Sequence, residues 1–284
     1  MTADLHTHTV HSDGTTRPAD NAALAAAAGL GALAVTDHDT TAGLPEAAAA
    51  CARHGVGFVL GIELSTEHAG RSVHLLGYFI DAFDRELVAE CARLRSARAL
   101  RARRILAKLD ALGVALPFAA VTALAGSAPI ARPHIAAAMV EAGVVPDVAA
   151  AFDGFLAEDA PAYAAKHALS PADGVRLLRA AGGAAVLAHP ELSSRHGAVT
   201  EELVAELARV GLAGLEADHA AHDGDAVRRW RACADRLGLL VTGSSDFHGA
   251  SKEVAIGAGT TPRATVERLR ERAAAVGSHG TGTH

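Results

Sequence analysis

Aromatic residues and cysteines are scarce in this chain of 284 residues, and each scarcity excludes a class of protein. Phe, Trp and Tyr make up 4% of the sequence, so alanine and leucine must supply most of any core. The three cysteines, Cys51, Cys91 and Cys233, stand singly, without a C-x-x-C spacing. They cannot form a disulfide framework and are typical of small buried side chains in a reducing compartment.

Long hydrophobic runs and an excess of positive charge are also missing. The longest apolar run, residues 22–35, is interrupted by Gly29 and Gly31 and is shorter than the roughly 20 residues of a membrane-spanning helix. The first residues carry neither the basic nor the apolar region of a secretion signal. The net charge of −6 gives no bulk attraction for nucleic acid. These absences favour a cytoplasmic protein that acts away from membranes.

Histidine, in contrast, is abundant. The chain has 16 histidines against 7 Phe, 1 Trp and 2 Tyr. Imidazole is the commonest metal ligand in proteins and titrates near neutral pH. Because half of the residues are apolar, a large core is available and wholesale disorder is excluded.

Short segments with strand character alternate with alanine-rich helical segments. The expected strands are 3–9, 32–39, 57–66, 71–79, 183–190, 211–219 and 239–248, and the expected helices are 18–30, 43–54, 171–181, 201–210, 225–237 and 262–276. This alternation predicts an α/β fold with a parallel sheet and helical crossovers, and seven repeats favour a barrel. Strands 57–66 and 71–79 have no helix between them and are expected to form a hairpin.

The middle of the chain shows no strand pattern. We therefore expect a discontinuous barrel, residues 1–84 and 168–277, with a helical insertion at 85–167 and a disordered tail at 278–284. The insertion begins with an arginine-rich helix, residues 86–112, whose apolar face would consist of Leu94, Leu100, Ile105 and Leu109. The arginines are spread around this helix, which favours a solvated basic face over the alternative of a nucleic-acid contact.

A histidine or a carboxylate lies near the C-terminal end of every expected strand. These residues are His6, His8, Asp13, His38, Glu63, His74, His189, His219, Asp246 and His248. In a barrel of this kind the strand ends converge on one face, where active sites are found. Side chains two apart on a strand share a side, so the pair His6 and His8 is expected to point the same way, as is the pair Asp246 and His248.

Such a gathering of polar side chains inside a barrel is costly unless they are paired or bind cations. A site for several divalent metal ions removes this cost. Mixed nitrogen and oxygen ligands without thiolate suit Zn²⁺, Mn²⁺ or Fe²⁺ and exclude an all-oxygen calcium site. Asp37 and Asp39, which flank His38, could orient a ligand imidazole or stabilise a turn.

The motifs that carry these residues resemble those of a known family. They are His6-Thr-His8, Asp13-Gly14, Thr36-Asp37-His38-Asp39, Gly61-Ile-Glu63, Ala188-His189-Pro190 and Ser245-Asp246-Phe247-His248. Together and in this order they resemble the PHP (polymerase and histidinol phosphatase) family. The resemblance implies a distorted (β/α)7 TIM-like barrel with three metal ions. It assigns His6, His8, Glu63 and Asp246 to the first ion, Glu63, His74 and His189 to the second, and Asp13, His38 and His248 to the third.

The insertion narrows this resemblance. The segment Ala131-Arg132-Pro133-His134, the pair Ala162-Tyr163 with Lys166, and the spacing of His219 and His222 resemble the nucleotide phosphatases of the family. The resemblance implies substrates such as AMP or 3′,5′-nucleoside bisphosphates, with 5′–3′ exoribonucleases as relatives. It makes Arg132, His134 and His219 catalytic candidates that also bind substrate, and adds Lys166 and His222 as substrate contacts. A planar guanidinium suits phosphate, although a solvated loop is the alternative for Arg132.

The expected reaction is hydrolysis of a small phosphorylated nucleotide by attack of a metal-bound hydroxide on phosphorus. Three other functions remain open: a 5′–3′ exoribonuclease on short 5′-phosphorylated RNA, an amidohydrolase-like C–N hydrolase, and a metal-holding module without activity. The basic residues of the insertion favour phosphate over a neutral amide.

Overall fold

The computed structural model describes residues 1–126, 130–157, 160–164, 168–194 and 199–277. It divides into two compact units, one formed by Met1–Cys91 together with the chain from Ala168 onwards, and the other by Ala92–His167. The division falls inside a long helix, α3 (Arg85–Ala111). Lys166 and the expected tail at 278–284 lie outside the described residues.

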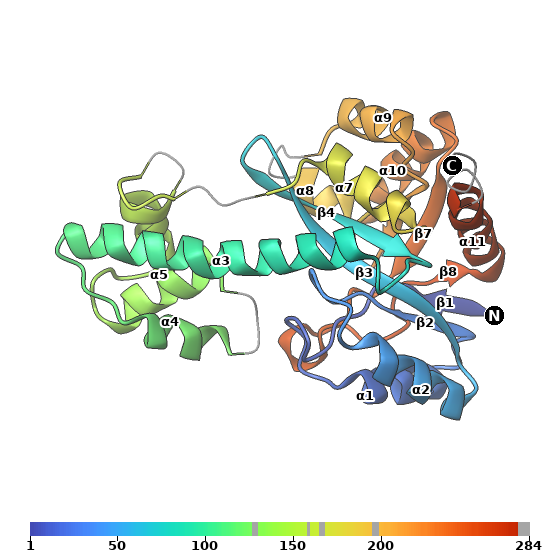
Figure 1. Ribbon diagram of the computed structural model, residues 1–284, viewed down its shortest axis with the longest axis horizontal. Helices are drawn as coiled ribbons and strands as arrows, with labels where there is room; N and C mark the ends of the chain where they lie inside the picture. Colours follow the sequence, from blue (N-terminus) through green and yellow to red (C-terminus); the bar gives the residue numbers. More distant parts are fainter. Residues whose placement is uncertain (127–129, 158–159, 165–167, 195–198, 278–284) are drawn as a thin grey trace. The chain divides into compact units, whose positions relative to one another are not determined.

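The first unit is built on one eight-stranded sheet (Figure 1). Its strands are β1 (Thr2–Asp4), β2 (Ala32–Val35), β3 (Gly57–His68), β4 (Arg71–Tyr78), β5 (Ala184–Leu187), β6 (Gly214–His219), β7 (Leu240–Ser244) and β8 (Thr261–Pro262). The order is β7-β6-β5-β4-β3-β2-β1-β8. Strands β1 to β3 and β5 to β7 run parallel, and β3 and β4 form the expected antiparallel hairpin. The sheet is a distorted, nearly closed TIM-like barrel, which confirms the predicted fold class.

The barrel has one strand more than the seven expected. Strand β8 pairs antiparallel with β1, with Ala3 opposite Thr261. The Thr261 hydroxyl also accepts a hydrogen bond from the Gly243 amide at 2.9 Å and donates one to the Gly243 carbonyl at 2.8 Å. A side chain therefore links β8 to β7, where a backbone ladder would close an ideal barrel. With two residues, β8 is too short to leave a periodic pattern in the sequence.

Replacing Thr261 with Val should therefore destabilise the barrel. Valine keeps the shape but leaves the buried Gly243 amide without its acceptor, which costs about 1–3 kcal/mol. We expect a lower midpoint of thermal unfolding measured by circular dichroism. Thr260→Val, at the adjacent half-buried position, is the matched control, and an equal loss for both variants would contradict a closing role for Thr261.

Helices cover the strands of the first unit. They are α1 (Pro18–Ala27), α2 (Leu44–His54), α7 (Pro171–Ala180), α8 (Pro190–Ser194), α9 (Glu201–Arg209), α10 (Gly224–Arg236) and α11 (Arg263–Gly277), and a 3-10 turn, η2, covers Gly249–Ser251. Side chains cap three of them: Ser170 on α7, Thr200 on α9 and Asp223 on α10 each accept a hydrogen bond from the first turn. The three cysteines are buried, as expected.

Helices alone form the described part of the second unit. Besides α3 they are α4 (Phe118–Ala125), α5 (Arg132–Glu141), α6 (Val148–Ala151) and a π-helical turn, η1 (Phe152–Leu156). Ile105 and Leu109 of α3 are buried in its core, as predicted, and Leu94 is buried too. The prediction for Leu100 was wrong, because its side chain is 53% exposed.

Two arginines of α3 contribute to packing in this unit. Arg101 donates a hydrogen bond to the Ala164 carbonyl at 2.7 Å, and the guanidinium of Arg103 lies 3.8 Å from the centre of the Phe118 ring. The arginine-rich helix is thus more than a solvated basic face. Among the described residues, no helix is both long and apolar enough to cross a bilayer.

Candidate metal centre

Glu63 and His74 lie within β3 and β4, but the predicted ligands that follow β1, β2 and β7 lie just beyond these strands. Strand β1 ends at Asp4, β2 at Val35 and β7 at Ser244, so these expected strands were too long. The segments that follow stay in register through isolated parallel bridges, Thr7 with Phe247 and His38 with Glu63. The short extensions carry His6, His8, His38, Asp246 and His248 to the same end of the barrel as Glu63.

Glu63, on β3, is the centre of the arrangement, and its side chain is 1% exposed. Five imidazoles surround its carboxylate, those of His6, His8, His38, His74 and His189. Oε2 lies 3.1–3.3 Å from the first three rings. Oε1 lies 2.9 Å from Nδ1 of His74 and 3.1 Å from Nε2 of His189. The two oxygens thus face two separate sets of nitrogens.

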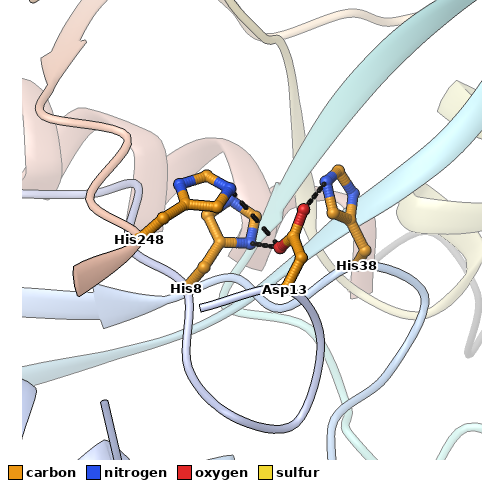
Figure 2. A group of neighbouring side chains, drawn as sticks. All are labelled: His8, Asp13, His38 and His248. Carbon is orange, nitrogen blue, oxygen red and sulfur yellow. Dashed lines mark ion pairs between the residues drawn. The ribbon is translucent and has the colours of Figure 1, made fainter. Parts of the chain in front are cut away.

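Two further carboxylates complete the cluster. Asp13 has Oδ1 at 3.3 Å from Nδ1 of His8 and 3.4 Å from Nε2 of His248, while Oδ2 lies 3.5 Å from Nε2 of His38 (Figure 2). Asp246 has Oδ1 at 3.3–3.5 Å from nitrogens of His6, His8 and His248. The backbone of Asp246 is left-handed, with φ of 53°, a strained conformation for a residue with a side chain.

All nine predicted ligands therefore lie together. Ligand atoms within 4.8 Å of one another define four overlapping groups that could hold a metal ion: His8, Asp13, His38 and His248; His6, Glu63 and His189; His6, His8 and Asp246; His38, Glu63 and His74. The donor set is imidazole and carboxylate without thiolate, which fits first-row divalent ions. The buried Nδ1 of His189 has no hydrogen-bond partner among the described residues.

The charges of the cluster act on its ligand groups in different directions. Against the effect of burial, neighbouring carboxylates raise the pKa of His6, His8 and His189. Two other groups are in the state that a metal ligand requires. Burial lowers the pKa of His38 well below its usual range, and the neighbouring His8 and His74 lower it further; a neutral ring has a lone pair to offer. Burial would raise the pKa of Glu63, but the surrounding His38, His6 and His74 hold it well below its usual value. Glu63 is therefore a carboxylate at neutral pH.

Glu216 also contacts the cluster, although no motif of the sequence singles it out. It is fully buried on β6, and its oxygens lie 3.2 and 3.3 Å from Nδ1 of His6. The carboxylate also accepts hydrogen bonds from the His189 amide at 2.8 Å and from the Ser244 hydroxyl. Burial would raise the pKa of Glu216, but the charge of His6 and its hydrogen bond lower it to about 2. A charged residue in the buried stretch Gly214–Ala217 was the signal available in the sequence.

Asp37 and Asp39 accept hydrogen bonds from neighbouring segments of the chain. Asp37 accepts hydrogen bonds at 2.7 Å from the amide and hydroxyl of Thr9 and from the Ser12 hydroxyl, which fixes the loop that leads to Asp13. Asp39 accepts one from the Ser65 amide at 2.8 Å. Of the two interpretations left open by the sequence, the contacts of Asp37 agree with the turn.

His219, the last residue of β6, and His222 have opposite hydrogen-bonding states. Nδ1 of His219 accepts a hydrogen bond from the Ala221 amide at 3.0 Å, so the proton of the neutral ring is on Nε2. Nε2 lies 3.5 Å from Oδ2 of Asp246. His222 lies 2.9 Å from the Ala217 carbonyl at Nδ1; Nδ1 must donate there, so Nε2 of the neutral ring is an acceptor. Burial lowers the pKa of His222.

Arg132 and His134 lie in the first turn of α5, in the second unit. Nη1 of Arg132 donates to the Leu156 carbonyl at 3.1 Å, and its guanidinium lies 5.6 Å from the ring centre of Phe152 and 5.8 Å from that of Tyr163. Nδ1 of His134 accepts a hydrogen bond from the Ala131 amide at 3.1 Å, which caps the start of the helix. Arg132 is thus held within its unit rather than solvated on a free loop.

Comparison with known proteins gives the family. Residues 4–106 match the PHP domain. A 3′,5′-nucleoside bisphosphate phosphatase of Chromobacterium violaceum is 37% identical over 246 residues, which cover 86% of each chain. A 5′-3′ exoribonuclease of Haemophilus influenzae is 31% identical over 86% of this chain and 89% of its own. The chain belongs to the PHP family, as the motifs predicted.

Solved structures agree on the fold. A protein of Bifidobacterium adolescentis, provisionally described as a metal-dependent phosphoesterase, superposes with a TM-score of 0.78 at 32% identity, covering 95% of this chain and 96% of its own. An amidohydrolase of Chromobacterium violaceum, with bound sulfate and no metal, superposes with a TM-score of 0.75 at 33% identity, covering 94% of this chain and 96% of its own.

Proposed function

We propose that this chain hydrolyses phosphomonoesters of small nucleotides, of the AMP or 3′,5′-nucleoside bisphosphate type, with the help of divalent cations. The observation that carries the proposal is the buried carboxylate of Glu63, whose two oxygens face two sets of imidazoles. Such a carboxylate can bridge two cations. The similarity to a 3′,5′-nucleoside bisphosphate phosphatase supports the substrate class.

Nine side chains would hold three ions of Mn, Fe or Zn. His6, His8, Glu63 and Asp246 would hold the first, Glu63 with His74 and His189 the second, and Asp13, His38 and His248 the third. The close approach of His74 and His189 to the same oxygen of Glu63 supports the second set. The contacts of both oxygens of Asp13 support the third.

When bound, the cations lower the pKa of a coordinated water towards about 7 and neutralise charge on the phosphoryl oxygens. The reaction adds the oxygen of one water to phosphorus and breaks the ester P–O bond. The proton of that water goes to the departing nucleoside oxygen, so the products are inorganic phosphate and an alcohol.

The chain's other polar residues serve the phosphate and the departing oxygen. His219 presents an N–H at Nε2 and can donate to either. Arg132 brings a guanidinium with donors beyond the one used by Leu156, and His134 and Lys166 add further donors. His222 presents an acceptor when neutral, which suits a substrate hydroxyl, whereas a phosphate contact there requires a protonated ring.

Release of inorganic phosphate from a substrate panel tests the proposal. The panel holds AMP, adenosine 3′,5′-bisphosphate, a short 5′-phosphorylated RNA and simple amides, each with and without Mn²⁺. We expect Mn²⁺-dependent release from a nucleotide, and at least about a tenfold loss for Arg132→Ala, since charged hydrogen bonds contribute about 1.5–3 kcal/mol. Arg104→Ala, at an exposed position on α3, is the matched control.

The relatives define the two rival outcomes. Faster release from the RNA than from any nucleotide would favour the 5′–3′ exoribonuclease, the activity named for the relative from Haemophilus influenzae. Turnover of amides alone would favour the C–N hydrolase, the class named for the structure from Chromobacterium violaceum. Metal uptake without any turnover would leave a binding module and contradict the proposal.

A further inference from the structure

The carboxylate of Asp246 has two faces with different partners. Its Oδ1 lies among nitrogens of the cluster, 3.3 Å from His8 and 3.4 Å from His6. Its Oδ2 faces away from those rings and accepts a hydrogen bond from Nζ of Lys252 at 2.6 Å, with Nε2 of His219 at 3.5 Å. Two N–H donors thus converge beside the cluster at one oxygen.

Lys252 reaches this point from the turn that follows the last cluster residue. It directly follows η2, four residues after His248, and its side chain is 43% exposed. An ammonium group has three donors, and Asp246 takes one of them. The sequence contains three lysines, Lys108, Lys166 and Lys252, and Lys252 alone belongs to the barrel unit.

Charge balance indicates what the other donors of Lys252 bind. The proposed ligands include three carboxylates, those of Glu63, Asp13 and Asp246. Even with the adjacent carboxylate of Glu216, three divalent ions would leave an excess of positive charge. The carboxylate of Asp246 offsets part of the repulsion between such a centre and the ammonium group of Lys252, and a further anion would offset the rest. A phosphoryl group bound at the centre supplies that anion, and it would lie within reach of a nitrogen that already contacts a ligand oxygen.

We propose that Lys252 binds an oxygen of the phosphoryl group that is hydrolysed. This inference rests on the proposed function and adds a substrate contact from the barrel itself. Lys252 and His219 are the two donors of this subsite, and Oδ2 of Asp246 holds both side chains in place. The class of ligand is a phosphate monoester or inorganic phosphate.

Steady-state kinetics of Lys252→Gln test the inference, with Lys252→Arg as the charge-preserving variant. Loss of a charged hydrogen bond to phosphate should lower kcat/KM about 10- to 100-fold, and by a similar factor for AMP and for adenosine 3′,5′-bisphosphate. Inhibition by inorganic phosphate should weaken at least about tenfold. Lys252→Arg should recover part of both, and the bound metal measured by elemental analysis should stay within about a factor of two.

Two variants and the wild type separate the outcomes. Arg53→Gln removes one positive charge from an exposed position of α2 and should leave both constants unchanged. A loss confined to the bisphosphate, or a loss of bound metal with unchanged phosphate inhibition, would overturn the inference. If the wild type hydrolyses a nucleotide and Lys252→Gln does so with the same kcat/KM, the role of Lys252 is rejected while the proposed function stands.

Discussion

Replacing Glu63 with Gln is expected to reduce Mn²⁺-dependent phosphate release at least about a thousandfold, equivalent to roughly 4 kcal/mol of transition-state stabilisation. The substitution removes the charge of the one carboxylate that contacts five imidazoles. It also replaces one of the two carboxylate oxygens, each of which faces a set of imidazole nitrogens, with an amide NH₂ group. An amide cannot bridge two cations as a carboxylate does. The rate of phosphate release at saturating Mn²⁺ measures the effect.

A matched variant on the same strand controls for this change. Glu67 lies four residues further along β3 and outside the nine clustered residues, so Glu67→Gln should retain activity within about threefold. Thermal unfolding of both variants shows whether the fold is intact. A folded Glu63→Gln variant with nearly full activity would contradict the bridging role.

Glu216→Gln should act through His6, because Glu216 contacts Nδ1 of this ring while Glu63 contacts Nε2. The His189 amide can only donate, so the single carbonyl oxygen of a glutamine must accept from it. The NH₂ group then takes the position of Oε1, the oxygen nearer to Nδ1 of His6, and favours the tautomer with the proton on Nε2. His6 loses the lone pair that faces Glu63 and Asp246. Loss of such a supporting partner lowers metal affinity or activity about 10- to 100-fold.

The Mn²⁺ concentration that gives half-maximal activity measures this effect. Ser244→Ala removes another hydrogen bond to the same carboxylate and leaves the contact with His6, so it should shift that concentration much less. The ¹⁵N chemical shifts of His6 give a second readout, since they distinguish the two tautomers. An unchanged tautomer in Glu216→Gln would contradict the positioning role.

Much of the cluster could be predicted from the sequence because many of its residues follow strand ends at short spacings. His6 and His8 follow β1, and Asp246 and His248 follow β7, so parallel strands bring them together whatever the lengths of the strands. The expected helices 171–181 and 201–210 were also found, as α7 and α9, and each begins at a side-chain cap. These are local signals, and local signals survive without knowledge of packing.

The remaining features depend on contacts between distant segments. Glu216 meets His6 across 210 residues, and Lys252 reaches Asp246 from a turn without a motif. Strand β8 pairs with β1 and is linked to β7 by the Thr261 side chain, and a strand of two residues leaves no pattern in the sequence. The exposure of Leu100 shows the same limit, because helical periodicity does not say which turns of a long helix are covered.

Elemental analysis of the purified protein tests the central claim most directly. The account predicts close to three divalent transition ions per chain after equilibration with Mn²⁺ and gel filtration, and a clear deficit in the Glu63→Gln variant. Well-folded wild-type protein that takes up no such ion, together with undiminished phosphate release in the presence of a chelator, would contradict it.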